Sequence, residues 1–186
     1  MKARISAAED SEILAGAESG RQALAALIRA VPTVAEPEPF FLDFAGAPPA
    51  TGSFLRECVL GFRKYVRAQG LPVYPVVANA SGATIEELTH LLEMLSDALP
   101  TCLLDADDRV TEPRIIGALD AAQQRTLDAV IEAGSATATA LAEKFSDEKV
   151  GTTAWNNRLV ALAQKGLLIE RTEGRAKTYE PVLKGL

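Results

Sequence analysis

The stretch from residue 137 to residue 180 constrains the fold of this chain more than any other, because its pattern predicts two short helices followed by a hairpin. In the first helix, apolar residues recur at helical spacing, at Ala138, Leu141, Ala142 and Phe145. After a turn over residues 146–151, the second helix repeats this pattern at Trp155, Leu159 and Leu162. We expect it to end at Gly166, since glycine readily adopts the left-handed conformation that follows helices.

Beyond Gly166, two strand-like runs at residues 167–171 and 176–179 flank the tripeptide Glu173-Gly174-Arg175. A glycine between two such runs favours a tight turn. The segment therefore predicts a hairpin with a basic tip.

The outward positions of the second helix carry hydrogen-bonding side chains, at Thr152, Thr153, Asn156, Asn157 and Arg158. In a DNA major groove, Asn can bond adenine in two places, Arg can bond guanine likewise, and Thr can contact phosphate or a thymine methyl. From the hairpin, Arg175 and Lys177 would reach phosphate or the minor groove. The alternative is a solvated helix followed by an ordinary hairpin, because Asn and Thr are also common surface residues.

The string from Thr153 to Arg171, together with residues 174–179, resembles the recognition helix and wing of bacterial winged-helix transcription regulators. The resemblance implies double-stranded DNA as the partner. It also implies that Trp155 belongs to the core of a winged helix-turn-helix domain, expected over residues 108–186, rather than stacking on DNA. Winged helices also dock on proteins, so a protein-binding module is a further alternative.

Charge is divided unevenly along the chain, which has a net charge of −6. Residues 149–186 carry seven Lys and Arg against three Glu, so they are net +4, and the preceding residues are net −10. A basic C-terminal segment after an acidic N-terminal one is consistent with a DNA-binding segment joined to a domain that binds a different partner. With so few cations, one copy should bind DNA modestly and with strong dependence on salt. We therefore expect a homodimer on a two-fold site.

The front of the chain alternates between helical and strand-like patterns, which predicts an α/β domain over residues 1–107. Helices are expected at residues 20–31, 54–66 and 84–99, the last with a capping box formed by Thr84 and Glu87. Strands are expected at residues 40–44, 73–78 and 101–105, joined by right-handed crossovers into a parallel sheet. Residues 107–120 are interpreted as the link between the two domains.

Two short motifs in this front part, Leu42 to Gly46 and Ala50 to Phe54, resemble the STAS-like family related to bacterial anti-sigma-factor antagonists. The resemblance covers about residues 5–107 and implies a parallel or mixed sheet with helices. It also implies phosphorylation of Ser53 or Thr51 by a histidine-kinase-like ATPase partner. The alternative is that these residues merely cap a helix. The family often begins with a clear strand, which only residues 3–6 could supply here.

If the front domain were an enzyme, the candidate catalytic residues would be carboxylates near the ends of predicted strands, Asp43, Asp105, Asp107 and Asp108. Yet no phosphate-binding glycine loop, zinc spacing or nucleophile elbow accompanies them. The single histidine, His90, lies within a predicted helix. We therefore expect no catalytic residues, metal or cofactor, and we interpret Cys58 and Cys102 as buried free thiols.

No apolar run approaches the roughly 20 residues needed to cross a bilayer, and the N-terminus lacks the apolar stretch of a secretion signal. The sequence thus predicts a cytoplasmic DNA-binding transcriptional regulator without a membrane partner, in which the STAS-like domain controls the winged helix. The alternative is a regulator that does not bind DNA, of the anti-sigma-factor antagonist type, switched by Ser or Thr phosphorylation.

Overall fold

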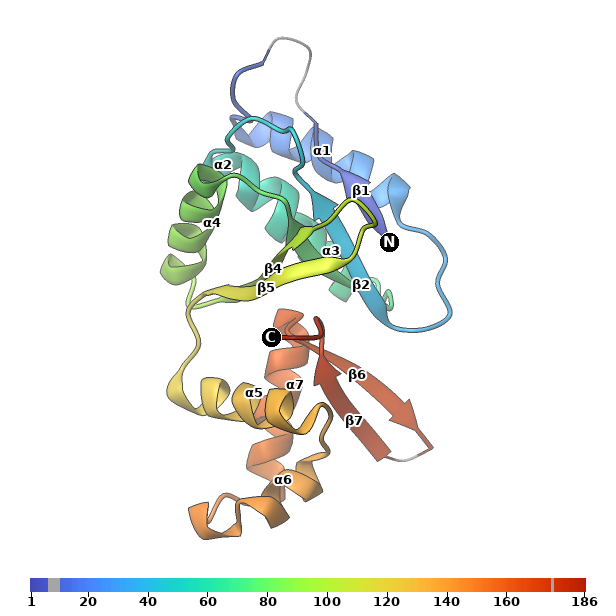
Figure 1. The fold of residues 1–186 in the computed structure, drawn as a ribbon, viewed down its shortest axis with the longest axis vertical. Coiled ribbons are helices and arrows are strands. Elements are labelled where there is room, and N and C mark those ends of the chain that lie inside the picture. Colours follow the sequence, from blue (N-terminus) through green and yellow to red (C-terminus); the bar gives the residue numbers. More distant parts are fainter. Residues whose placement is uncertain (7–10, 175) are drawn as a thin grey trace.

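The protein is of the mixed α/β class, with a five-stranded sheet and a separate two-stranded hairpin (Figure 1). The computed structural model describes residues 1–6, 11–174 and 176–186. Helices cover one face of the sheet, and the C-terminal helices and hairpin lie against the other side (Figure 1).

The strands of the large sheet follow one another in chain order. They are β1 (Lys2–Arg4), β2 (Glu38–Asp43), β3 (Val73–Ala78), β4 (Ala98–Leu104) and β5 (Val110–Gly117). The first four are parallel, and β5 is antiparallel to β4. The three strands expected at residues 40–44, 73–78 and 101–105 are confirmed as parallel neighbours. β1 supplies a short first strand.

Helices α1 (Ala17–Ala30), α3 (Gly61–Ala68) and α4 (Gly82–Met94) occupy the crossovers between the parallel strands. A short α2 (Gly52–Leu55) leads through a π-helical turn, η1 (Arg56–Leu60), into α3. All of these segments contribute to one apolar core with β2 and β3. Its fully buried members include Phe40, Phe54, Phe62, Leu88 and Leu92.

Helix α4 departs from the sequence prediction at both ends. Its N-cap is Ser81, whose hydroxyl accepts the Thr84 N–H at 3.3 Å, so Thr84 is not the cap. Thr84 is buried and instead accepts the Ala50 N–H at 3.1 Å. Glu87 likewise accepts the Gly52 N–H at 3.1 Å rather than closing a capping box. The helix stops at Met94, because the chain reverses and enters β4 at Ala98.

Strand β5 corrects the interpretation of residues 107–120 as a link. Eight of these residues form a strand that pairs with β4 along its length. Hydrogen bonding to a neighbouring strand satisfies backbone groups that a linker would leave to water. The sheet therefore extends to Gly117.

Side chains alternate between the two faces of β3. Val73 and Val77 pack into the core with the helices, whereas Tyr74, Val76 and Ala78 belong to a second cluster on the opposite face. That second cluster also contains Ile169, Val182 and Leu183 from the C-terminal end. The strand is buried on both sides, as expected for a parallel sheet covered on both faces.

The C-terminal part confirms the expected order of two helices and a hairpin, and a further helix precedes them. Helix α5 (Ala121–Ala133) precedes α6 (Ala138–Lys144), a 3-10 turn η2 (Ser146–Glu148) and α7 (Thr152–Lys165). The hairpin strands are β6 (Leu168–Glu173) and β7 (Ala176–Pro181). Trp155, Leu159 and Leu162 are fully buried as predicted, and Gly166 ends α7 in the left-handed conformation with φ 84°.

Both cysteines are buried and free, as the sequence predicts. Burial raises the pKa of Cys58 to about 12 and, together with the charge of Asp43, that of Cys102 to about 11. Both are therefore protonated thiols at neutral pH. Across the described ranges, no helix has the length and apolar character needed to span a membrane.

Candidate nucleic-acid interface

Helix α7 points its N-terminal end away from the large sheet (Figure 1). Its 14 residues make it roughly 20 Å long. Lys165 in its last turn contacts the sheet side of the molecule, so Thr152 and Thr153 stand at the opposite end, where both are exposed. The residue before the helix, Gly151, provides no side-chain cap. The Ala154 and Trp155 N–H groups bond the Gly151 carbonyl, which leaves those of Thr152 and Thr153 for an external acceptor, and the helix dipole favours an anion there.

This end of α7 opens into a hollow of about 470 Å³. Three elements line it, and the polar lining residues are Thr137 at the N-cap of α6, Thr139 of α6, Thr152, Thr153 and Asn156 of α7, and Lys177 of β7. Hydroxyl, amide and ammonium groups thus converge on one helix N-terminus. That combination suits a phosphate oxygen or the polar edge of a base.

The other two predicted residues of α7 lie differently. Asn157 is exposed and does not line the hollow. Arg158 is half-buried, and its guanidinium carbon lies 5.2 Å from the centre of the Trp155 ring. The structure therefore brings Thr152, Thr153 and Asn156 together, whereas Arg158 packs on the core.

On the hairpin, Lys177 is exposed and its ammonium lies 2.8 Å from a carboxylate oxygen of Glu170. Arg175, predicted at the hairpin tip, lies outside the described residues. Lys177 can therefore reach a polyanion only by exchanging the Glu170 carboxylate for a phosphate.

The α6–α7 region carries both signs of charge. Arg125 bonds Glu148, and Lys144 pairs with Glu132 at 3.0 Å, so these cations are already neutralised. Lys149 in the turn is exposed. Paired carboxylates thus offset most of the cations of this region, including Lys177 at the hollow.

Sequence reasoning missed Thr137 and Thr139. Thr137 caps α6 by accepting the Ala140 N–H at 3.1 Å. A Thr immediately before a run of apolar residues at helical spacing predicts a helix N-cap, so the sequence contains a signal for Thr137. Their place beside α7 depends on how the two helices pack, which the local pattern does not encode.

The opposite end of α7 is anchored by a cluster of charges. Asp97, just before β4, contacts the guanidinium of Arg63 and accepts a hydrogen bond from Lys165 Nζ at 3.1 Å. Arg63 Nη1 also donates to the carbonyls of Ala98 and Lys165, at 2.9 and 3.2 Å. Burial by itself would raise the pKa of Asp97, but the charge and hydrogen bonds of Arg63, the Ala98 N–H and Lys165 outweigh it and lower that pKa.

The predicted phosphorylation residues lie at the start of α2. Thr51 is the N-cap, and its hydroxyl accepts the Phe54 N–H and lies 3.1 Å from the hydroxyl of Ser53. Ser53 itself is exposed. The neighbouring Gly52 N–H is bonded to Glu87, so a carboxylate already occupies part of this helix end. Phosphorylation of Ser53 or Thr51 stays a prediction.

Three of the four carboxylates considered for catalysis line a polar hollow of about 490 Å³ at the carboxyl ends of the parallel strands, and they are Asp43, Asp105 and Asp108. Each has a structural partner: Asp43 accepts from Asn79 at 2.8 Å, Asp105 accepts backbone N–H groups, and Asp108 pairs with Lys2 at 2.5 Å. Asp107 pairs instead with Arg109, and His90 is exposed on α4. Within residues 1–6, 11–174 and 176–186, no group of His, Cys, Asp and Glu has the geometry to hold a metal.

Comparison of the chain with models of protein families gives no match, and comparison with curated proteins gives none either.

Proposed function

We propose that the protein is a DNA-binding transcriptional regulator, with α7 as its recognition helix, the β6–β7 hairpin as its wing and a STAS-like sheet domain that controls them. The observation that carries the proposal is the uncapped start of α7, which opens into a hollow lined by hydroxyl, amide and ammonium groups at the end of the helix away from the sheet. A duplex could approach this end without displacing the sheet.

The arrangement of the C-terminal elements supports the same proposal. Three helices are followed by a hairpin, and Ala136, just before α6, exchanges two 2.9 Å backbone hydrogen bonds with Tyr179 of β7. This bridge ties the hairpin to the helices, as the proposed wing requires. We propose homodimerisation on a two-fold site, because few unpaired cations are available in one copy.

The test begins with the full chain and a pool of random duplexes, from which bound sequences are selected. Affinity for the selected duplex is then measured at several salt concentrations. Binding should weaken as salt rises, because phosphate contacts release counterions. Asn157→Ala should lose about 1 to 3 kcal/mol of binding free energy, the range for one good base contact.

The matched control is Gln164→Ala, since Gln164 is also an exposed amide on α7 but lies near the end that contacts the sheet. It should bind the selected duplex as the unmodified protein does. Two outcomes would rule out α7 as a recognition helix and leave the protein-binding alternative. In one, the unmodified chain selects no duplex. In the other, Asn157→Ala and Asn156→Ala each bind the selected duplex as tightly as the unmodified chain.

A further inference from the structure

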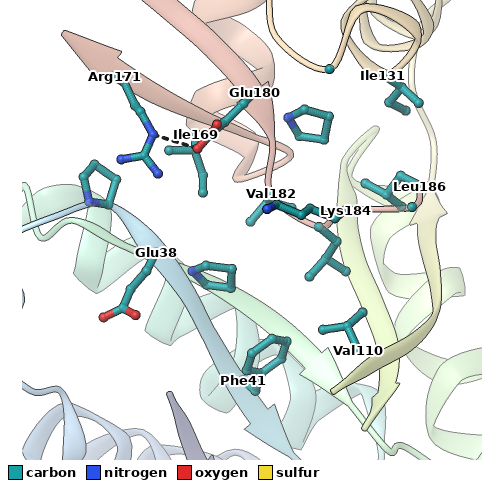
Figure 2. Close-up of a pocket in the computed structure, with 16 residues that line it drawn as sticks. Glu38, Phe41, Val110, Ile131, Ile169, Arg171, Glu180, Val182, Lys184 and Leu186 are labelled. Atoms are coloured by element: carbon teal, nitrogen blue, oxygen red, sulfur yellow. Dashed lines mark hydrogen bonds and ion pairs between the residues drawn. The ribbon is translucent and has the colours of Figure 1, made fainter. Parts of the chain in front are cut away.

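A cavity lies where the free face of the sheet meets the C-terminal helices and hairpin (Figure 2). Its volume is about 750 Å³, which is within the usual range of 300 to 1,000 Å³ for small-molecule sites. We name it the interface cleft. Its walls come from β2, β5, the end of α5, both hairpin strands and residues 182–186.

Apolar side chains form most of the wall. Phe41 and Val110 stand on the sheet side, Ile131 on α5, and Ile169 and Leu186 on the C-terminal side (Figure 2). Phe41, Val110, Ile131 and Leu186 are only half-buried, so each keeps apolar surface exposed to the cleft. Covering such surface with an apolar ligand is favourable, by about 25 cal/mol for each Å² removed from water.

The charged groups at the cleft indicate which charge the ligand should carry. Glu180 is committed to Arg171, with 2.7 Å between its carboxylate oxygen and Nε (Figure 2). Lys184 makes no ion pair within the described part of the chain. Arg171 also donates from Nη1 to Glu36 at 3.4 Å, which leaves the Nη2 donors beyond those given to Glu180 and Glu36. The cleft therefore offers a surplus of hydrogen-bond donors from two cations.

From these features we propose that the interface cleft binds an apolar small molecule with one carboxylate, such as a medium-chain aliphatic acid. The apolar body occupies the space between Phe41, Val110 and Ile131, and the carboxylate accepts hydrogen bonds from Lys184 and Arg171. Glu38, which also lines the cleft, disfavours a second negative charge on the ligand.

Binding at this place has a consequence for the assembly of the molecule. One wall belongs to the sheet and the other to the hairpin and α5, so a bound ligand adds contacts between them. A ligand that binds only the folded protein raises its stability by mass action. The cleft inference does not depend on DNA binding, because both the ligand and its effect are measured on the protein alone.

The experiment is calorimetric titration of the full chain with decanoate, decanol and decylamine, with thermal unfolding measured alongside. Decanoate should bind with one molecule per chain and raise the Tm. Lys184→Met should weaken decanoate binding about ten-fold or more, the effect of losing a hydrogen bond to a charged group, and should leave decanol binding unchanged. Tighter binding of decylamine than of decanoate would overturn the anion assignment and point to Glu38.

A blocking variant separates the cleft from general surface binding. Val110→Trp adds bulk at the cleft wall and should abolish decanoate binding while the circular dichroism spectrum stays native. The matched control is Leu103→Trp, which adds the same side chain at an exposed position outside the cleft and should bind decanoate normally. Equal binding by the two variants, or no binding of decanoate to the unmodified chain, would refute the proposal. If Val110→Trp does not fold, the Lys184→Met comparison still decides it.

Discussion

Lys165, in the last turn of α7, donates a hydrogen bond of 3.1 Å to the carboxylate of Asp97, 68 residues earlier in the chain. The same carboxylate contacts Arg63, and all three side chains are mostly buried, with exposed fractions of 12% to 17%. The last turn of α7 is therefore held against α3 and the start of β4 by one shared anion.

Replacement of Asp97 should destabilise the whole molecule. Asp97→Ala leaves two partly buried cations facing each other, and breaking a buried charge pair in this way typically costs about 3 kcal/mol or more. The free energy of unfolding in urea measures the loss. Asp107→Ala is the matched control, because Asp107 also pairs with an arginine but both partners are exposed, so its change should be too small to detect.

The Asp97 cluster also sets an acid limit on stability. The pKa of the Asp97 carboxyl is lower in the folded protein than the usual aspartate value, so the unfolded chain takes up the proton first as the pH falls. The stabilisation is thus complete above about pH 4, the ordinary aspartate range, and is lost as the pH falls through the folded pKa. Unfolding measured from pH 7 to pH 3 should show this decline. In Asp97→Asn the decline should be shallower, and an identical profile would contradict the assignment.

The fold also depends on a close approach of α1 to the start of the next helix. A Cβ added at Gly20 would lie 2.7 Å from the Phe54 carbonyl oxygen and 2.8 Å from the Glu57 Cβ. Alanine normally favours a helix over glycine by about 1 kcal/mol, but overpacking costs about 1 to 3 kcal/mol. Gly20→Ala should therefore lower the Tm.

Gly82→Ala is the control for that substitution. Gly82 begins α4, and no atom lies within 4 Å of its added Cβ. It should leave the Tm unchanged or raise it slightly. If the two variants behave alike, helix propensity rather than packing decides the outcome at Gly20.

The core of the C-terminal helices can be tested through Trp155, the single tryptophan of the chain. It is fully buried, its ring centre lies 5.7 Å from that of Phe145, and its Nε1 has no hydrogen-bond partner among the described residues. Trp155→Ala should cost about 3 to 5 kcal/mol of unfolding free energy. Trp155→Phe should cost clearly less, because it keeps a ring and removes an unpaired donor. Circular dichroism in urea measures both, and an undiminished stability of Trp155→Ala would contradict the burial.

Helical periodicity was enough to predict the core face of α7, because Trp155, Leu159 and Leu162 recur at the spacing of one helix side. Strand β5 could not be predicted in the same way. Pro113 interrupts it, Glu112 has φ 47°, and its burial alternates only weakly, so its local pattern resembles a loop. What makes it a strand is pairing with β4, a tertiary contact.

The choice between Ser81 and Thr84 as the cap of α4 has the same origin. Both hydroxyls are chemically suitable caps. The buried bond from the Ala50 N–H to Thr84 decides between them, and it joins residues 34 positions apart. For the candidate interface, the sequence predicted Thr152, Thr153 and Asn156, whose position off the buried face of α7 follows from helix rotation. It could not predict that Lys177 would be paired with Glu170 or that Arg158 would pack on Trp155.

The pair between Lys177 and Glu170 yields the sharpest prediction for the proposed DNA contact. Glu170→Gln removes the charge that holds Lys177 but keeps an acceptor oxygen for the Tyr179 hydroxyl, now 3.1 Å from the carboxylate. The released ammonium should strengthen duplex binding about two- to five-fold, the equivalent of one exposed ion pair. The dependence of affinity on salt should steepen by about one ion.

The matched control is Glu180→Gln, which makes the same charge change on the same hairpin. It leaves Arg171 paired with Glu36 alone, and the Arg171 side chain lies at the interface cleft rather than beside α7. Glu180→Gln should raise the affinity for the duplex less than Glu170→Gln does, because it acts only through the long-range effect of the lost negative charge. Lys177→Ala combined with Glu170→Gln should remove the gain completely. If Glu170→Gln leaves both the affinity and its salt dependence unchanged, Lys177 does not face the phosphates, and the hollow at the start of α7 contacts DNA through its Thr and Asn side chains alone.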